Sequence, residues 1–184
     1  MKVKLKENKK IALIVAAVMI LFSVLVLGGT KLRADRDEVQ ELFYEGVNRD
    51  SLGIYNDLQA RLESAYNLIT IANKYLPANS EEASNLLGAR QSLIDAKTPS
   101  EMYNANHTLT VAVDTLYSEL NNYEMDEEDK RLAAKQFAEL SSRNQTISHD
   151  LFNAEASHFN STMGTFPAWL VAAVNGIEPV DLYR

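Results

Sequence analysis

The sequence predicts an all-α protein in which an N-terminal transmembrane helix is followed by an antiparallel up-and-down four-helix bundle. A long uncharged apolar stretch near the N-terminus predicts the first part. The residues after it place apolar side chains three and four positions apart, which is the spacing of one face of a helix. The 184 residues include only 7 Gly and 4 Pro, and no sustained alternation of β-branched residues indicates strands.

The N-terminal part of the chain predicts a basic tail and a membrane span. The tail holds five lysines and one glutamate, whereas Ser23 is the only polar residue between Ile11 and Leu27. At about 1.5 Å per residue, such a helix approaches the roughly 30 Å hydrocarbon thickness of a bilayer, so we expect the lipid bilayer as a partner. We therefore divide the chain into a basic tail (1–10), a transmembrane helix (11–29) and a bundle domain (30–184).

The charges beside this span favour one orientation. Five lysines precede it, and Lys31, Arg33 and Arg36 follow it together with acidic residues. Because positive residues are retained on the cytoplasmic side, we expect a cytoplasmic N-terminus and a bundle outside the cell membrane. The alternative is a cleaved signal peptide, which also combines a basic start with an apolar core. The length of the core and the lack of an Ala-x-Ala pattern at its end favour an uncleaved anchor.

The first helices of the bundle are bounded by clear signals. We expect the transmembrane helix to continue through Phe43 and to weaken around Gly46 and residues 51–53. A second helix starts at Ile54 and ends at Pro77, which cannot continue it. A third starts at Asn79–Glu82, where an N-cap side chain precedes an acid by three residues in a capping box.

Two longer helices complete the predicted bundle. Thr98–Glu101 forms a second capping box, with proline at the first helical position. The apolar residues from Met102 to Tyr123 form a coiled-coil-like seam that needs a partner helix. Asp126 begins the last helix, which we expect to continue to Gly164. Helices of this kind with short connections pack most simply as an up-and-down bundle.

Aromatic residues recur at intervals of seven near the C-terminus, as Phe-Asn, Phe-Asn and Phe-Pro, before an apolar segment and a glycine. This pattern resembles the C-terminal signature of the LemA family, in which Tyr-Asn, Tyr-Asn and Phe-Pro have the same spacing. Leu58–Arg61, Leu68–Tyr75 and Ala89–Arg90 support the resemblance upstream. The resemblance implies a membrane helix before a helical bundle, and it marks these signature residues: Phe152, Asn153, Phe159, Asn160, Phe166, Pro167 and Gly176.

The departures from this signature limit what the resemblance implies about activity. His149 stands where the family has an arginine, and phenylalanine replaces tyrosine at positions 152 and 159. The Tyr-Pro that the family has between the last two long helices is replaced by Tyr123-Glu124-Met125. A function that depends on those tyrosine hydroxyls or on that arginine therefore does not carry over.

The heptad also has a purely structural interpretation. Seven residues are nearly two helical turns, so the three phenylalanines fall on one face and can pack as a ladder into the bundle. The neighbouring amides of Asn153 and Asn160 would then need partners and could fix the register. We expect four apolar residues beyond the heptad helix to be mostly buried: Phe166, Trp169, Leu170 and Val171. The alternative is an exposed recognition surface around Phe166-Pro167.

Composition excludes several classes of chemistry. The chain has no cysteine, which removes thiolate metal sites, disulfides and cysteine nucleophiles. The net charge of −7 becomes −11 once the tail, at about +4, is set apart, and an acidic domain is a poor match for nucleic acid. No phosphate-binding glycine loop and no nucleophile elbow occur.

One pattern in the sequence resembles part of a metal site but is incomplete. Glu155 and His158 form a Glu-x-x-His, the pair that di-iron bundles use from one helical face, but His107 and His149 lack the matching glutamate. We therefore predict no catalytic, cofactor-binding or metal-ligating residue. Three Asn-x-Thr glycosylation patterns fall inside expected helices, where chance explains them: Asn106, Asn144 and Asn160.

The function we expect is that of a noncatalytic, membrane-anchored component of the cell envelope that acts through protein contacts. Its partner would be an unidentified membrane or envelope protein, and no nucleic acid. The alternative is a sensor that binds a small ligand between its helices and passes the signal to the membrane helix. A bundle metalloenzyme is a third and weaker hypothesis.

Overall fold

A computed structural model describes residues 2–47 and 52–184, with side chains from Lys9 onward, and every regular element in this part is a helix. The weakening expected at Ser51 and the lysine side chains before Lys9 lie outside the described residues. The chain divides into two compact units: one comprises Met1–Gln40 and Ala156–Val180, and the other Glu41–Glu155 and Asp181–Arg184. The helices are α1 (Lys2–Glu45), α2 (Ile54–Ala72), α3 (Glu81–Asp95), α4 (Pro99–Leu120), α5 (Glu127–Ser148), α6 (Phe152–Met163) and α7 (Ala168–Asn175).

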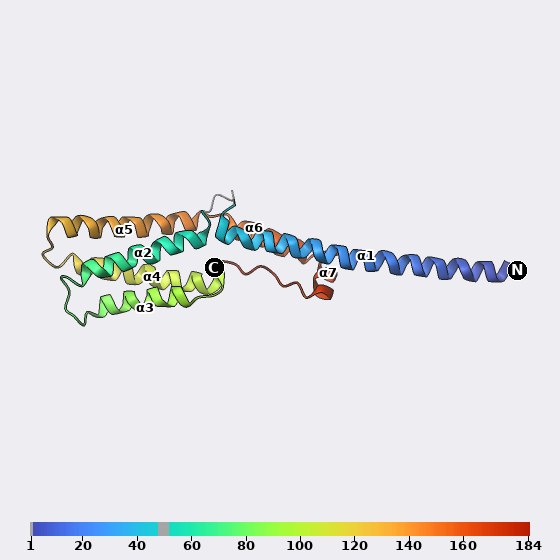
Figure 1. The fold of residues 1–184 in the computed structure, drawn as a ribbon, viewed down its shortest axis with the longest axis horizontal. Helices are drawn as coiled ribbons and strands as arrows, with labels where there is room; N and C mark the ends of the chain where they lie inside the picture. Colours follow the sequence, from blue (N-terminus) through green and yellow to red (C-terminus); the bar gives the residue numbers. More distant parts are fainter. Residues whose placement is uncertain (1, 48–51) are drawn as a thin grey trace. The chain divides into compact units, whose positions relative to one another are not determined.

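Helices α2 to α5 form the expected four-helix bundle in the second unit (Figure 1). Helix α2 packs against α5, and α3 packs against α4, while α2 also contacts α3 and α4. The apolar stripes predicted from the sequence meet in the centre, which confirms the fold class. The most buried leucines come from all four helices: Leu58, Leu68, Leu86, Leu109, Leu116, Leu120 and Leu140.

The helix starts largely follow the sequence signals. The capping box at Thr98 is present in full, because the Thr98 hydroxyl accepts from the Glu101 N–H and the Glu101 carboxylate accepts from the Thr98 N–H. Asp126 caps α5 by accepting from the Asp129 N–H at 2.7 Å. The start of α3 lies one residue later than expected: Ser80, not Asn79, is the N-cap.

The last long helix does not continue to Gly164, as the sequence had suggested. Helix α5 ends at Ser148, His149 caps its C-terminus, and α6 begins at Phe152. The side chain of Asp150 accepts a hydrogen bond from the Phe152 N–H at 2.7 Å. A short acidic side chain that binds the backbone locally competes with the helical ladder, which explains the break.

The C-terminal end of α1 is part of the bundle unit. Phe43 is fully buried, and its ring lies 5.2 Å from that of Phe152 and 6.0 Å from that of Tyr183. The chain then approaches itself closely, since a Cβ on Gly53 would lie 2.5 Å from the Phe43 carbonyl oxygen. Asn56 also donates to the Tyr44 carbonyl oxygen at 2.8 Å. These contacts hold the end of α1 against the start of α2.

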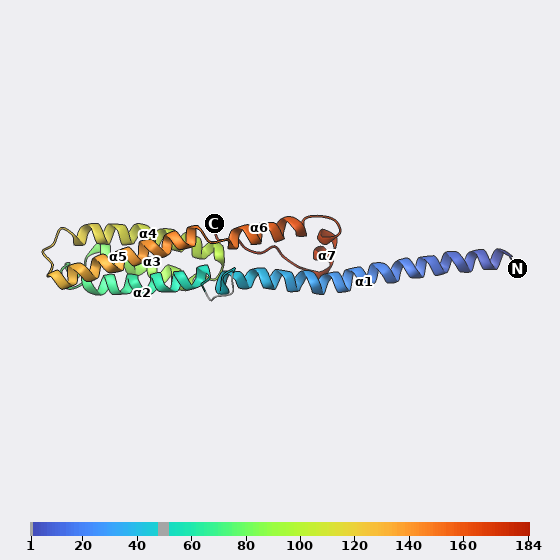
Figure 2. The ribbon, with the colours of Figure 1, turned by 90° about the horizontal axis from the view of Figure 1, so that it is seen from above.

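In the other unit, α7 and the end of α6 lie beside α1 (Figure 2). Arg33 donates to the Asn175 carbonyl oxygen at 3.1 Å, and Arg36 donates to that of Glu178 at 2.8 Å. Helix α1 is the one helix in the described part that is long and apolar enough to cross a membrane. It continues without a break past residue 29, as expected.

An ion pair connects the end of α2 with the start of α5. The Lys74 ammonium donates to both carboxylate oxygens of Asp129 at 2.8 Å, and the Tyr75 hydroxyl donates to the same carboxylate at 2.7 Å. These hydrogen bonds hold the pKa of Asp129 below its usual range. The bond to Asp129 also raises the pKa of Tyr75 to about 12.

We expect Asp129→Asn to destabilise the fold at neutral pH and to weaken its acid sensitivity. Because the folded pKa is depressed, the carboxylate stabilises the fold fully above its unfolded pKa of about 3.9. That stabilisation is lost as the pH falls through the lower folded value. Thermal unfolding of the full chain in detergent, followed at decreasing pH, measures both effects. Glu127→Gln, an exposed acid in the same turn, is the control; an unchanged acid transition in the Asp129 variant would contradict the prediction.

Candidate functional site

Two asparagines of the heptad bind the C-terminal segment of the chain through its backbone. Asn153 donates to the Tyr183 carbonyl oxygen at 2.7 Å and accepts from the Tyr183 N–H at 2.9 Å. Asn160 makes the same pair of bonds to Val180, at 2.9 and 2.8 Å. Each amide therefore satisfies one donor and one acceptor of a backbone that has no secondary-structure partner there. The expectation that these amides need partners is correct.

The heptad spacing follows from the geometry of the two elements. Seven residues of helix rise about 10.5 Å, and three residues of extended chain cover about 10 Å. Asparagines seven apart on α6 therefore match backbone groups three apart in a segment that runs antiparallel to the helix. Seven positions also keep both amides on one face. The repeat thus encodes a helix that binds an extended chain.

The aromatic part of the heptad behaves differently at its third position. Phe152 and Phe159 are buried, with exposed fractions of 0% and 7%, but Phe166 is 76% exposed. Helix α6 ends at Met163, so Phe166 lies beyond the helix and leaves the ladder. The expectation that Phe166 and Trp169 are mostly buried is wrong, since Trp169 is 50% exposed.

The remaining signature residues shape the turn into and out of α7. Leu170 is half-buried and Val171 is buried, so α7 covers one face only. Pro167, preceded by a cis peptide bond, is the N-cap of α7. Gly176 ends the helix in the left-handed conformation, with φ of 62°, and its N–H donates to the Ala172 carbonyl oxygen. Glycine suits this position because it adopts positive φ without steric cost.

A buried arginine that the sequence analysis did not single out as a site residue lies in the centre of the bundle. Arg61 of α2 is 1% exposed and donates to the Leu140 carbonyl oxygen on α5 and, at 2.8 Å, to the Thr110 hydroxyl on α4. Burial lowers the pKa of this guanidinium to about 10, so it stays protonated at neutral pH. Its position three residues after Leu58, on the apolar stripe of α2, is the signal that could have identified it.

Thr110 connects Arg61 to further polar groups beside a cleft. The Asn106 side chain donates to that of Asn144 at 3.1 Å, and Thr110 donates to the Asn106 carbonyl oxygen. The Asn106 side-chain oxygen and the Tyr183 hydroxyl are buried without a hydrogen-bond partner in the described part. The cleft has a volume of about 390 Å³, and its lining includes Tyr103, Asn106, His107, Thr110, Asn144 and Tyr183.

The structure places both residues of the Glu-x-x-His pair on the surface of the protein. Glu155 and His158 are both exposed on α6. Within the described residues, no group of three or more His, Asp or Glu side chains is arranged to hold a metal ion. Of the three glycosylation patterns, Asn106 is buried and Asn160 is engaged with the backbone of Val180.

Asn153 and Asn160 together form what we call the clamp on the C-terminal segment. Replacing either clamp asparagine should release this segment. Asn153→Ala or Asn160→Ala removes two hydrogen bonds and leaves a backbone N–H and C=O unpaired, which should cost about 1–3 kcal/mol. Hydrogen exchange of residues 177–184 in the full chain should become faster in both variants. Asn104→Ala, an exposed residue that bonds only within its own helix, is the matched control. Unchanged protection in both clamp variants would contradict the assigned role.

Two glycine substitutions should have opposite effects on stability. Gly176→Ala forces a side chain into positive φ and should destabilise the fold by about 1–2 kcal/mol. Gly88→Ala, inside α3, should stabilise it by about 0.5–1 kcal/mol. A Cβ at either position meets no atom within 4 Å, so conformational preference alone decides the sign. Chemical unfolding of the full chain measures both; shifts of the same sign would refute the assignment.

Comparisons with known proteins agree with this architecture. The model of the LemA family matches residues 51–184, a region that includes α2 to α7 and every signature residue described above. A search of curated proteins found none that matches the chain. Because the family model covers well over half of the sequence, the chain belongs to the LemA family.

Proposed function

We propose that this protein is a noncatalytic, single-pass membrane protein that acts in the cell envelope through protein contacts. Residues 1–10 form a cytoplasmic tail, 11–29 span the bilayer and 30–184 form the external domain. The observation that carries the proposal is the continuity of α1: its apolar stretch leaves large side chains uncovered, while Phe43 on the same helix is fully buried. A helix of this kind connects a lipid environment to a folded domain.

The uncovered side chains of α1 favour lipid over a protein core. Leu13, Phe22 and Leu27 are each about two-thirds exposed or more. A helix in a soluble protein buries its apolar side chains, whereas a membrane span presents them on all faces. Lys31 ends the uncharged stretch, and Arg33 and Arg36, which bond to backbone carbonyl oxygens of the chain, follow it.

The buried polar residues of the bundle support a noncatalytic role. Asp57 accepts from Arg143 at 2.9 Å, Asp129 accepts from Lys74, and Arg61 donates to the backbone of α5. Buried charges in such arrangements hold helices together. A domain of this type presents its acidic surface to a partner at the membrane, where anchoring raises the effective concentration.

Charges placed within the apolar stretch should abolish anchoring. We expect Val18→Arg combined with Phe22→Arg to release the full chain from membranes under alkaline extraction, because each arginine costs about 2.5–3.5 kcal/mol at the centre of a span. Asn121→Arg with Asn122→Arg, on an exposed connection, is the matched control.

Crosslinking in intact membranes with mass spectrometry then identifies the partner, and protease added outside the cell reports the orientation. Extraction of the unmodified chain, or a bundle protected from external protease, would contradict the proposal.

A second candidate function, ligand sensing, is favoured by the cleft beside Arg61. Two of its buried polar side chains, Asn106 and Tyr183, which lie close enough to interact with each other, offer an acceptor and a hydroxyl to a small polar ligand. Native mass spectrometry of the purified full chain would show a retained small molecule, which Asn106→Leu should remove and Asn122→Leu should not. Recovery of such a molecule without any crosslinked partner would favour the sensor.

A further inference from the structure

A second uncharged stretch lies far from the first in the sequence. No charged residue or histidine occurs from Phe159 to Ile177, a run that includes the end of α6, the turn and the whole of α7. Its only polar side chains are hydroxyls and amides. The stretch turns back on itself between α6 and α7, and neither helical segment is long enough to cross a bilayer, since α7 has only 8 residues.

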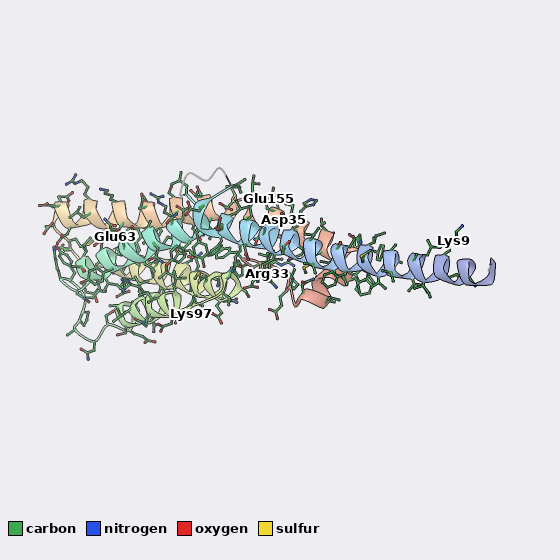
Figure 3. The ribbon with its side chains drawn as sticks, turned by 45° about the vertical axis from the view of Figure 1, so that its right-hand side comes forward. Lys9, Arg33, Asp35, Glu63, Lys97 and Glu155 are labelled. Carbon is green, nitrogen blue, oxygen red and sulfur yellow. The ribbon has the colours of Figure 1, made fainter. Side chains whose placement is uncertain are left out.

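This second stretch packs along the first. Val171 lies 3.4 Å from the position of a Cβ on Gly28, and Asn175 donates to the Leu25 carbonyl oxygen at 3.0 Å. A Cβ on Gly29 would lie 2.4 Å from the Asn175 side-chain oxygen, so only glycine allows this approach. Figure 3 shows α7 beside the part of α1 nearer to Arg33 than to Lys9. The contacts therefore place α7 against the C-terminal half of the apolar stretch.

The other face of α7 is apolar and uncovered. Phe166 and Val174 are 76% and 60% exposed, and Trp169 is 50% exposed. Trp169 and Val174 lie about 140° apart around α7, on either side of the exposed Ala173, and away from the buried Val171 and Ala172. Between α7 and α1 lies a groove of about 480 Å³ with an almost wholly apolar lining, formed by Ala17, Ile20, Leu21, Val24 and Leu25 with Phe166, Pro167, Leu170 and Val171.

The position of α7 along α1 determines its depth if the span lies in a bilayer. Leu25 precedes Lys31, the first charge after the span, by six residues or about 9 Å, and Ala17 precedes it by about 21 Å. A segment that contacts this range cannot lie in water while α1 is embedded. Part of the backbone of the turn is hydrogen-bonded internally, because Trp169 donates to the Thr165 carbonyl oxygen at 2.8 Å and Val171 to that of Pro167.

We propose that residues 164–176 insert into the same membrane leaflet as the C-terminal half of the α1 apolar stretch, as a re-entrant turn and helix whose uncovered face contacts lipid acyl chains. This inference rests on the proposed anchoring by α1. It commits to lipid rather than to a protein ligand, because the groove and the uncovered face are continuous with the apolar surface of the span. Arg33, which binds the C-terminus of α7, lies at the level of the headgroups.

Single thiols test this insertion because the chain contains no cysteine. The full-length protein is reconstituted at low protein-to-lipid ratio in phosphatidylcholine nanodiscs, whose two faces are both accessible, and treated with a water-soluble maleimide. Val174→Cys should react at least about tenfold more slowly than Val111→Cys, a similarly exposed position on α4, since lipid suppresses thiolate formation.

The outcomes separate this inference from the anchoring on which it rests. Phe22→Cys, in the centre of the span, reports anchoring alone. If it is protected while Val174→Cys reacts as fast as Val111→Cys, the anchor is correct and the inserted helix is overturned. If Phe22→Cys also reacts freely, the anchor itself is overturned, and the insertion with it. Protection of both Phe22→Cys and Val174→Cys supports the two proposals together.

The native chain provides a second measurement without a new side chain near α7. Trp169 is the sole tryptophan, so its fluorescence reports α7 directly. In the same nanodiscs, lipids brominated along their acyl chains should quench it more strongly than aqueous iodide does. Quenching by iodide at the rate of free tryptophan would overturn the insertion even if a cysteine variant were misfolded.

Discussion

The uncovered apolar surface of α1 is the constraint on which the other features of this chain depend. Most of its large apolar side chains from Ile11 to Leu27 are exposed, and α7 packs only along the C-terminal half of this stretch, yet the same helix ends near a core residue, Phe43. One continuous helix therefore joins two environments with opposite demands. The apolar stretch of α1 is unfavourable in water, whereas the C-terminal end of α1 is needed in the core of the bundle unit. The charges at Lys31 and Arg33 therefore mark the boundary between these two parts of the helix.

The signature residues can be understood as a way to bind a segment without secondary structure. The chain from residue 177 onward has backbone groups that need partners, and Asn153 and Asn160 supply them from α6. An amide provides one donor and one acceptor, the same pair that a neighbouring strand would offer. This explains why asparagine recurs at positions 153 and 160. The aromatic residues of the heptad are packed differently from one another, since Phe152 and Phe159 are buried and Phe166 is exposed.

What the sequence predicted correctly is mostly local. The capping box at Thr98, the N-cap at Asp126 and the apolar stripes depend on residues three or four apart, so they are visible in the sequence. The break after Ser148 depends on one Asp150 side chain that competes with the helix, and the exposure of Phe166 depends on where α6 ends. Arg61 was not identified as a site residue because its partners, Thr110 and Leu140, are distant in the sequence. Hydrophobic periodicity also does not indicate which polar residues are buried in a core.

The positions where the family has tyrosine accommodate phenylalanine in this chain. The ring of Phe152 is fully buried against that of Phe43 at 5.2 Å, and Phe159 is also buried. A hydroxyl at either ring would require a partner inside an apolar cluster, at a cost of about 1–3 kcal/mol if it found none. The neighbouring asparagines already provide the polar contacts to the C-terminal segment. Loss of the hydroxyls therefore leaves the hydrogen bonds of Asn153 and Asn160 intact, while the buried rings of Phe152 and Phe159 still fill the core.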